Sequence, residues 1–274
     1  MAIRRREYFV QLWNTRTQAP IDDDSGTYQV YTAGTPDRAS ITDAAGATMT
    51  QEVVGTSFVG QTMTDGEIHF FTNVTVSSVD ISVLTAGGRS YFLKGITRSS
   101  GRVDVDPDQQ NYVLVVGINE KASSTTVRPL GFQLRKGMLV HDVLVKVTAA
   151  FNGAAAASSE FDLGRSADPN GLVVACNASV TGFFQFHGLG STTGIVRQHT
   201  LYGADLLSYK LTSTGTISSI DWYIKKSYLA KTGVASNNLV YKRGTALTAS
   251  ITAQSGKGYV YYVYTLLPGM SASV

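Results

Sequence analysis

Cysteine is almost absent from this chain of 274 residues, which contains Cys176 alone. A single cysteine cannot form an internal disulfide, and it cannot supply a four-cysteine zinc or iron–sulfur site. Long apolar runs are also missing, because no stretch approaches the roughly 20 residues that a helix needs to cross a bilayer. We therefore expect neither a disulfide scaffold nor a membrane-spanning helix, and no membrane partner.

Charged residues are scarce as well, at 16% of the chain, against roughly 25% in an average soluble domain. Small neutral polar residues take their place, with 30 Thr, 26 Ser and 27 Gly. Helices usually cover their wet faces with Glu, Lys and Arg, whereas strands and turns use Thr, Ser and Gly. The composition therefore predicts an all-β protein, and a hydrophobic share of 43% is enough for a packed core.

The first residues, Met1–Arg6, are basic like the start of a signal peptide. The segment that follows, Tyr8–Arg16, has no long apolar stretch and no small-residue cleavage site. We therefore expect no secretory leader, and we expect the chain to fold in a cytoplasm.

The charge is divided unevenly along the chain. Residues 1–118 carry 9 Lys/Arg and 13 Asp/Glu, a net of −4, and residues 119–274 carry 14 and 7, a net of +7. This division predicts two β domains, residues 1–118 and 129–274, joined by the polar linker 119–128. The apolar run Tyr112–Ile118 is then the last strand of the first domain. The basic residues are scattered and match no nucleic-acid motif, so no direct nucleic-acid binding is expected.

Both halves contain runs in which apolar and polar side chains alternate. Such alternation is typical of a sheet with one wet face, and turn signals such as Asp65-Gly66 and Gly87-Gly88 lie between the runs. We therefore expect two antiparallel β-sandwich or jelly-roll-like domains in series. The clearest alternating runs are Tyr8–Trp13, Val79–Leu84, Val143–Thr148 and Ile220–Lys225.

The run Tyr259–Leu267 breaks this alternation, because large side chains point to both faces. Tyr259 and Tyr261 lie on one face, and Tyr262 and Tyr264 lie on the other. Such a strand is covered on both sides. Two interpretations stay open: a central core strand whose hydroxyls reach the rim of the sheet, or a strand whose outer face meets another subunit, since tyrosine is enriched at interfaces.

Residues able to do chemistry are few. His141 precedes Asp142, but neighbouring strand residues point to opposite faces and cannot form a dyad. Cys176 with His187 and His199 suggests a thiolate–imidazole pair or a shared metal, yet Cys176 lies in an apolar run and no short zinc-type ligand pair is present. We expect these residues to be inert, and the protein to have no catalytic, cofactor-binding or metal-binding residue and not to be an enzyme.

Two acidic turns raise the question of calcium. The run 104–108, DVDPD, begins like a helical calcium loop, but such a loop needs Gly at its sixth position and Glu at its twelfth. Gln109 and Val115 occupy those positions. An irregular calcium site here or at Asp22–Asp24 stays open, and the alternative is a solvated acidic turn.

Three segments resemble stretches of small virion proteins of tailed bacteriophages: Tyr8–Asp24, Phe161–Val174 and Ala253–Leu267. The resemblance is to accessory head proteins of the cement, decoration or head-fibre type. It implies an all-β, Ser/Thr/Gly-rich protein that forms a symmetric homo-oligomer, often a trimer, on the capsid. The implied partner is the major capsid protein or another virion protein, and the implied location is the virion, assembled in the host cytoplasm.

The leading functional hypothesis is therefore a capsid cement or decoration subunit that stabilises the phage head shell. A second hypothesis is a structural component of the tail, neck or baseplate. A third is a carbohydrate- or receptor-binding module, for which exposed aromatic side chains are needed, and Trp13 and Tyr31 are the candidates.

The N-terminal arm offers one candidate docking element. Arg4, Arg5 and Arg6 precede the strand expected to begin at Tyr8, so we expect the arm to lie across an acidic partner surface. The alternative is that the arginines fold back onto their own acidic domain. Exposed ion pairs of this kind each contribute roughly 0–1 kcal/mol.

Overall fold

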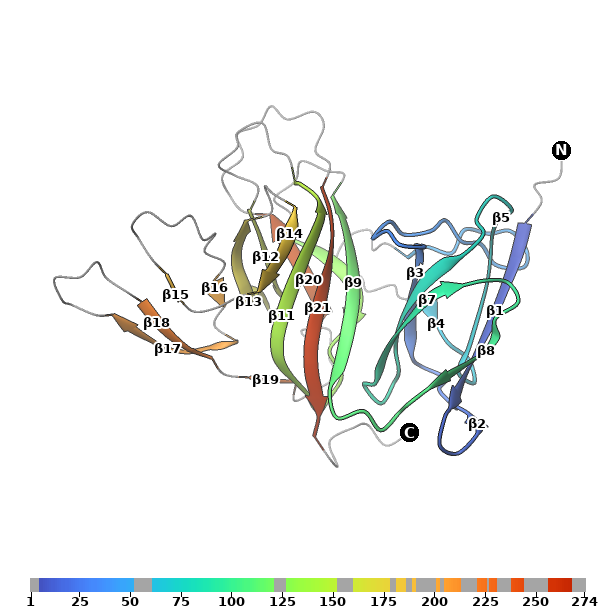
Figure 1. The fold of residues 1–274 in the computed structure, drawn as a ribbon, viewed down its shortest axis with the longest axis horizontal. Helices are drawn as coiled ribbons and strands as arrows, with labels where there is room; N and C mark the ends of the chain where they lie inside the picture. Colours follow the sequence, from blue (N-terminus) through green and yellow to red (C-terminus); the bar gives the residue numbers. More distant parts are fainter. Residues whose placement is uncertain are drawn as a thin grey trace.

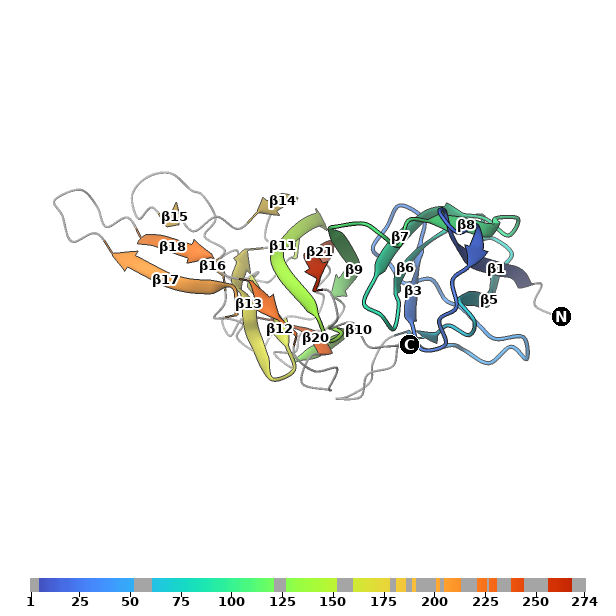
Figure 2. The ribbon, with the colours of Figure 1, turned by 90° about the horizontal axis from the view of Figure 1, so that it is seen from below.

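The computed structural model describes residues 5–51, 61–120, 127–151, 160–177, 181–185, 189–190, 201–202, 205–212, 221–225, 227–230, 238–243 and 256–267. Every regular secondary-structure element in these residues is a β-strand. Nearly all strand pairs are antiparallel, so the predicted all-β fold is confirmed. No helix in this part of the chain is long and apolar enough to cross a membrane. Figures 1 and 2 show an elongated molecule with an N-terminal and a C-terminal unit side by side.

The N-terminal unit, residues 5–105, encloses one core between two four-stranded sheets. In the first sheet β1 pairs with β2 and β5 antiparallel and with β8 in parallel, and the second sheet has the order β4-β3-β6-β7. Tyr8, Val10 and Leu12 of β1 are buried and Phe9 is exposed, as the alternation predicts. The strands are β1 (Arg5–Asn14), β2 (Ala19–Pro20), β3 (Thr27–Thr32), β4 (Gln61–Thr62), β5 (Glu67–Asn73), β6 (Val79–Leu84), β7 (Ser90–Ile96) and β8 (Gly101–Val105).

The C-terminal unit, residues 112–267, places its core between two larger sheets. One has the order β14-β11-β21-β9 with β19 beside β11, and the other has the order β10-β20-β12-β13-β16. In β11, Val143, Val145 and Val147 face this core, as predicted. The strands are β9 (Tyr112–Glu120), β10 (Arg128–Gln133), β11 (Met138–Ala149), β12 (Glu160–Arg165), β13 (Asp168–Asn177), β14 (Gly182–Gln185), β16 (Leu201–Tyr202), β19 (Tyr228–Leu229), β20 (Asn238–Arg243) and β21 (Gly256–Leu266).

A small third sheet has the order β15-β18-β17. Figures 1 and 2 place it at the end of the molecule remote from the N-terminal unit. Its strands are β15 (Leu189–Gly190), β17 (Leu207–Thr212) and β18 (Asp221–Lys225). The strand predicted at Ile220–Lys225 is thus present as β18, and its predicted side-chain alternation lies outside the described side chains.

The expectation that Tyr112–Ile118 closes the first domain is wrong. This segment is β9, which pairs with β21 along its whole length and contributes Leu114 and Val116 to the C-terminal core. The physical reason is that the partner strand lies far away in the sequence, where no local pattern can indicate the pairing. The polar stretch 119–128 is likewise not all linker, because it begins inside β9 and ends in β10, and residues 121–126 lie outside the described residues.

Buried hydrogen bonds join the two units. The Tyr31 hydroxyl of β3 accepts a hydrogen bond from the backbone N–H of Gly117 in β9 at 3.0 Å, and it donates one to the side-chain oxygen of Gln29. Gln29 in turn donates from Nε2 to the carbonyl of Leu130 in β10 at 2.7 Å. Because all of these groups are removed from water, the free energy of separating the units includes the cost of leaving them unpaired.

Strand β6 shows how this contact changes the side-chain pattern. Asp80 and Ser82 were predicted on a wet face, yet every residue of β6 is buried. The Ser82 hydroxyl donates to the carbonyl of Val115 in β9 at 2.6 Å. The Asp80 carboxylate accepts the backbone N–H groups of Gly34 and Gly95, both at 2.8 Å. The second face of β6 is therefore covered by the C-terminal unit and by loops.

Two buried tyrosines of β21 give opposite stability predictions. The Tyr264 hydroxyl donates to the carbonyl of Gly88 at 2.7 Å, whereas the Tyr262 hydroxyl has no hydrogen-bond partner among the described residues. We expect Tyr264→Phe to lower the free energy of unfolding by about 1–2 kcal/mol, because a buried carbonyl loses its donor. Tyr262→Phe should be neutral or stabilising. Urea unfolding of both variants checks this, and an equal loss in the two would contradict it.

Candidate interaction surface

The four tyrosines of β21 are divided between two environments. Tyr262 and Tyr264 lie in the C-terminal core, where burial raises the pKa of both hydroxyls. Tyr259 lies on the opposite face and meets Phe92 of β7 edge-on, with ring centroids 6.3 Å apart. Tyr261, on that same face, is half-buried. The core interpretation therefore describes the inner face of β21, and the interpretation as a subunit contact concerns Tyr261, because Tyr259 is only 7% exposed.

The outer face of the sheet β14-β11-β21-β9 carries an apolar cluster around Tyr261, beside the exposed Lys146 of β11. The strand register places Tyr261 between Leu144 of β11 and Val115 of β9. Phe183 of β14 stacks on Tyr261 at 5.6 Å and is 59% exposed, and Val113 is 40% exposed. Figure 1 looks onto this sheet, with its strands side by side. The surface termed here the outer sheet face consists of Val113, Leu144, Phe183, Tyr261 and Val263. Val115 and Tyr259 lie on the same side of the sheet but are only 4% and 7% exposed.

A groove of about 390 Å³ continues the outer sheet face onto the N-terminal unit. Ser90–Leu93 of β7 line one side, and Val113 and Val115 of β9 line the other. Asp104–Asp106 make its acidic end. A partner seated on the outer sheet face would therefore contact both units at once.

The sequence pattern indicates the tyrosines of this surface but not the side chains around them. Val113 and Val115 alternate with the core residues Leu114 and Val116, so β9 is apolar on both faces. That double-sided pattern was a usable signal for a second covered face. Phe183 offered no comparable signal, because its place beside Tyr261 depends on which strands pair.

The first strand begins earlier than predicted and includes part of the arginine arm. Strand β1 starts at Arg5 and not at Tyr8, since Arg5 already pairs with Asn73 of β5. Arg4 lies outside the described residues. Two of the three arginines therefore belong to a sheet, which limits how they could reach a neighbour.

The side chains of Arg5 and Arg6 contact their own unit. The Arg5 guanidinium donates to the carbonyl of Asp43 at 3.0 Å and lies over the ring of Phe71, 5.6 Å from its centroid. Arg6 donates from one terminal nitrogen to the carbonyl of Val76 at 2.7 Å. The alternative that the arginines fold back onto their own domain therefore describes Arg5 and Arg6, and the remaining donors of each guanidinium are what a partner would meet.

Three exposed carboxylates lie close together at the acidic turn Asp22–Asp24. Asp22, Asp24 and Asp65 each place an oxygen within 4.8 Å of the others. The negative charge of the neighbouring Asp24 carboxylate raises the pKa of Asp65. Asp23 serves the fold instead, because its carboxylate accepts the N–H groups of Gly26 and Ala86. The residues that could hold a cation are thus three exposed carboxylates, against the 6–8 oxygen ligands typical of calcium.

The other acidic turn is held by arginines. Arg16 pairs with Asp106 at 3.7 Å and with Asp108 at 3.0 Å, and Arg102 pairs with Asp104 at 2.7 Å. All five side chains are well exposed, so each pair contributes little to stability. Among the described residues, none of these carboxylates belongs to a group of three that could share a metal ion. The solvated acidic turn is therefore the interpretation that the contacts favour.

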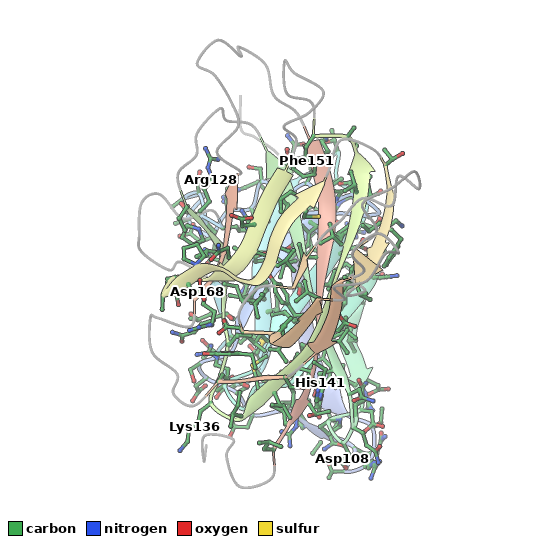
Figure 3. The ribbon with its side chains drawn as sticks, turned by 90° about the vertical axis from the view of Figure 1, so that its left-hand side faces the viewer. Asp108, Arg128, Lys136, His141, Phe151 and Asp168 are labelled. Carbon is green, nitrogen blue, oxygen red and sulfur yellow. The ribbon has the colours of Figure 1, made fainter. Side chains whose placement is uncertain are left out.

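His141, labelled in Figure 3, lies at a β-bulge in β11. Its two ring nitrogens lie 2.9 Å from the hydroxyls of Ser227 and Thr265. A serine beside an imidazole has the geometry of a nucleophile and its base, but here a threonine hydroxyl holds the place where a triad has a carboxylate. The ring is therefore positioned by two neutral hydroxyls.

Cys176 of β13 is fully buried in the C-terminal core, and this confirms its predicted apolar setting. Burial in apolar surroundings disfavours the thiolate, which is the reactive form. His187 and His199 lie outside the described residues, so their inertness stays a prediction.

The two aromatic residues considered for sugar binding have other surroundings. Tyr31 is fully buried and belongs to the contact between the units. Trp13 is half-buried, and the Arg102 guanidinium lies over its ring, 4.2 Å from the centroid. A sugar ring would have to displace this guanidinium to stack on Trp13.

Comparisons of the chain with protein-family models, with curated proteins and with solved structures found no match. The functional interpretation of the outer sheet face and of the arginines in β1 therefore depends on their geometry and on the resemblance of the three segments given above.

Proposed function

We propose that this protein is a structural subunit of a bacteriophage virion: a cement or decoration protein that binds the major capsid protein or another head protein and stabilises the shell. We further propose that it acts as a homo-oligomer, a trimer by the resemblance, and that it is not an enzyme. The outer sheet face is the proposed contact between copies.

The outer sheet face is the observation that carries this proposal. A solvated sheet face alternates polar residues with those of the core, whereas Leu144, Tyr261 and Val263 point apolar side chains outward from adjacent strands. Contiguous exposed apolar surface of this kind is typical of a protein contact. Aromatic residues such as Phe183 and Tyr261 are also enriched at such contacts.

The buried hydrogen bonds between the two units support the same role. Tyr31, Gln29 and Ser82 make buried hydrogen bonds across the boundary, so one copy holds its shape between two neighbours. A cement protein strengthens a shell only if it transmits strain between the subunits that it contacts, and an articulated linker would not do so.

Charge placed on the outer sheet face should abolish self-association. We expect Phe183→Asp together with Val113→Asp to convert the oligomer to a monomer, because both side chains are exposed in one copy and a carboxylate cannot be buried unpaired between copies. Lys136→Asp, a charge change at an exposed turn, is the control. Light scattering after gel filtration measures the mass, and a monomeric parent protein would contradict the proposed contact.

The location in the particle is tested separately. Mass spectrometry of purified virions should find the protein, and electron microscopy of whole particles should show its density on the head shell. Density on the tail, neck or baseplate would replace the cement role with a structural role there, and absence from virions would overturn the proposal.

A carbohydrate-binding module is the second candidate, and one observation favours it. The rings of Phe183 and Tyr261 stack 5.6 Å apart on the outer sheet face, and Phe183 is 59% exposed. Exposed aromatic rings offer stacking surfaces to sugar units. Specific retention on a glycan array that Phe183→Asp abolishes would favour this function over the structural one.

A further inference from the structure

Strand β1 has an edge that its sheet leaves open. Leu12 donates to the carbonyl of Gly66 and accepts from the N–H of Ile21, both on the side of β5 and β2. Because backbone groups alternate along a strand, odd-numbered residues of β1 direct theirs to the opposite side. Thr15, just after β1, does so and donates to Val105 of β8.

Glu7 lies on this open edge. Its partner across the β1–β5 ladder is Phe71, which exchanges both backbone hydrogen bonds with Thr42 on the side away from β1. Glu7 and Phe71 are thus a non-hydrogen-bonded pair, and the N–H and carbonyl of Glu7 point away from β5. Strand β8 pairs with β1 from Val10 onward, and the alternation of backbone groups then gives the Phe9 carbonyl to the N–H of Gly101. Among the described residues, nothing pairs with this edge of β1 before Phe9.

Beside this edge lies a concavity of about 590 Å³ with a cationic and partly apolar lining. Phe9 and Val74 are 37% and 39% exposed there. Arg98 makes no hydrogen bond or ion pair with a described residue, and the Glu7 carboxylate is engaged by His69 at 2.9 Å. The lining consists of Arg5, Arg6, Glu7, Phe9, Val74, Arg98 and Ser99.

We propose that the open edge of β1 binds an extended acidic segment of a partner protein by strand addition. The segment would pair with the backbone of Glu7 and with the N–H of Phe9, in line with β8, while Arg6 and Arg98 take its carboxylates in bidentate contacts. Phe9 and Val74 contact its apolar side chains. The inference rests on the proposed function only for the location of the partner in a virion. The acidic segment itself is selected by the open edge and by Arg5, Arg6 and Arg98.

The backbone contribution is tested at one position with a matched pair of variants. Glu7→Pro removes the N–H of the open edge, and it leaves the ladder to β5 intact because that N–H takes no part in it. Glu7→Ala removes the carboxylate and keeps the N–H. The probe is a fluorescein-labelled, capped heptapeptide in which Glu and Val alternate, titrated by anisotropy into the full chain.

We expect Glu7→Pro to weaken binding of this peptide by about tenfold or more, as the loss of a strand hydrogen bond and of the edge geometry implies. Glu7→Ala should bind as well as the parent or more tightly. Equal binding by the two variants would overturn strand addition. If Glu7→Pro fails to fold by thermal melting, the parent protein with a peptide N-methylated at alternate residues gives the same test, because methylation blocks pairing and keeps the charge.

The charge contribution is tested with Arg98→Ser, which removes an exposed side chain. It should weaken binding several-fold and reduce the loss of affinity between 0.1 M and 1 M salt, where the Debye length falls from about 10 Å to about 3 Å. Equal binding of the peptide with Lys in place of Glu would overturn the acidic specificity. Peptide binding is scored independently of virions, so the edge site and the virion role fail separately.

Discussion

Gly131→Ala is expected to lower the free energy of unfolding by about 3 kcal/mol, with about 1–2 kcal/mol from backbone strain and about 1–3 kcal/mol from a broken buried hydrogen bond. Gly131 in β10 has a φ of +78°, which L side chains rarely adopt, and a Cβ there would lie 1.9 Å from Nε2 of Gln29. Gln29 would have to leave the carbonyl of Leu130 and the hydroxyl of Tyr31. One methyl group thus breaks the hydrogen-bond chain between the two units.

Gly95→Ala is the matched control for this prediction. Gly95 has a φ of +63°, close to that of Gly131, but a Cβ there meets nothing within 4 Å. Its cost should be the backbone strain alone, about 1–2 kcal/mol. Urea unfolding measures both variants. Equal losses would show that Gln29 yields without cost and that its hydrogen bonds do not hold the units together.

Arg165→Met is expected to destabilise the C-terminal unit by about 3 kcal/mol. The reason is that the substitution leaves the largely buried Asp205 carboxylate without its cationic partner. Two guanidinium nitrogens of Arg165 lie 2.8 Å and 3.0 Å from the two oxygens of Asp205. The two side chains are only 13% and 14% exposed. The guanidinium also lies over the ring of Tyr228, 4.3 Å from its centroid, and methionine keeps part of that packing.

The double variant Arg165→Met with Asp205→Leu separates pairing from burial. Replacing both charges with apolar side chains removes the desolvation cost along with the attraction, so the double variant should be more stable than either single one. A double-mutant cycle from urea unfolding gives the coupling between the two positions. Additive losses would show that the pair contributes no more than an exposed ion pair does.

The open edge and the outer sheet face differ in how far the sequence indicated them. Arg5 and Arg6 were noted as a basic arm, but Arg98 was not, because it reaches them from a turn that only the folded sheet brings near. The acidic turn at Asp22 and Asp24 was noted too, and its third carboxylate, Asp65, arrives from another loop. In each case the residues close together in the sequence could be predicted to form a cluster, but the member from a distant part of the sequence could not.

Side-chain alternation is a local property, and it is what the sequence determined by itself. The period of two in Tyr8–Trp13 and in Val143–Thr148 places one set of side chains in a core whatever the neighbouring strands are. The scarcity of charge and the abundance of Thr, Ser and Gly likewise follow from strands and turns. The all-β class and the inner faces of these strands therefore needed no tertiary information.

Only the tertiary structure decided which strands pair and what covers their second faces. Strand pairing joins backbone groups that every residue has, so nothing in β9 distinguishes β21 from a partner in the first domain, and β9 was assigned to the wrong unit. The same holds for β6: its side-chain alternation predicts a solvent-exposed outer face, but the C-terminal unit covers that face in the structure. The side chains of a strand determine that one of its faces is buried. The non-local pairing of backbone groups determines which other strand or unit covers that face.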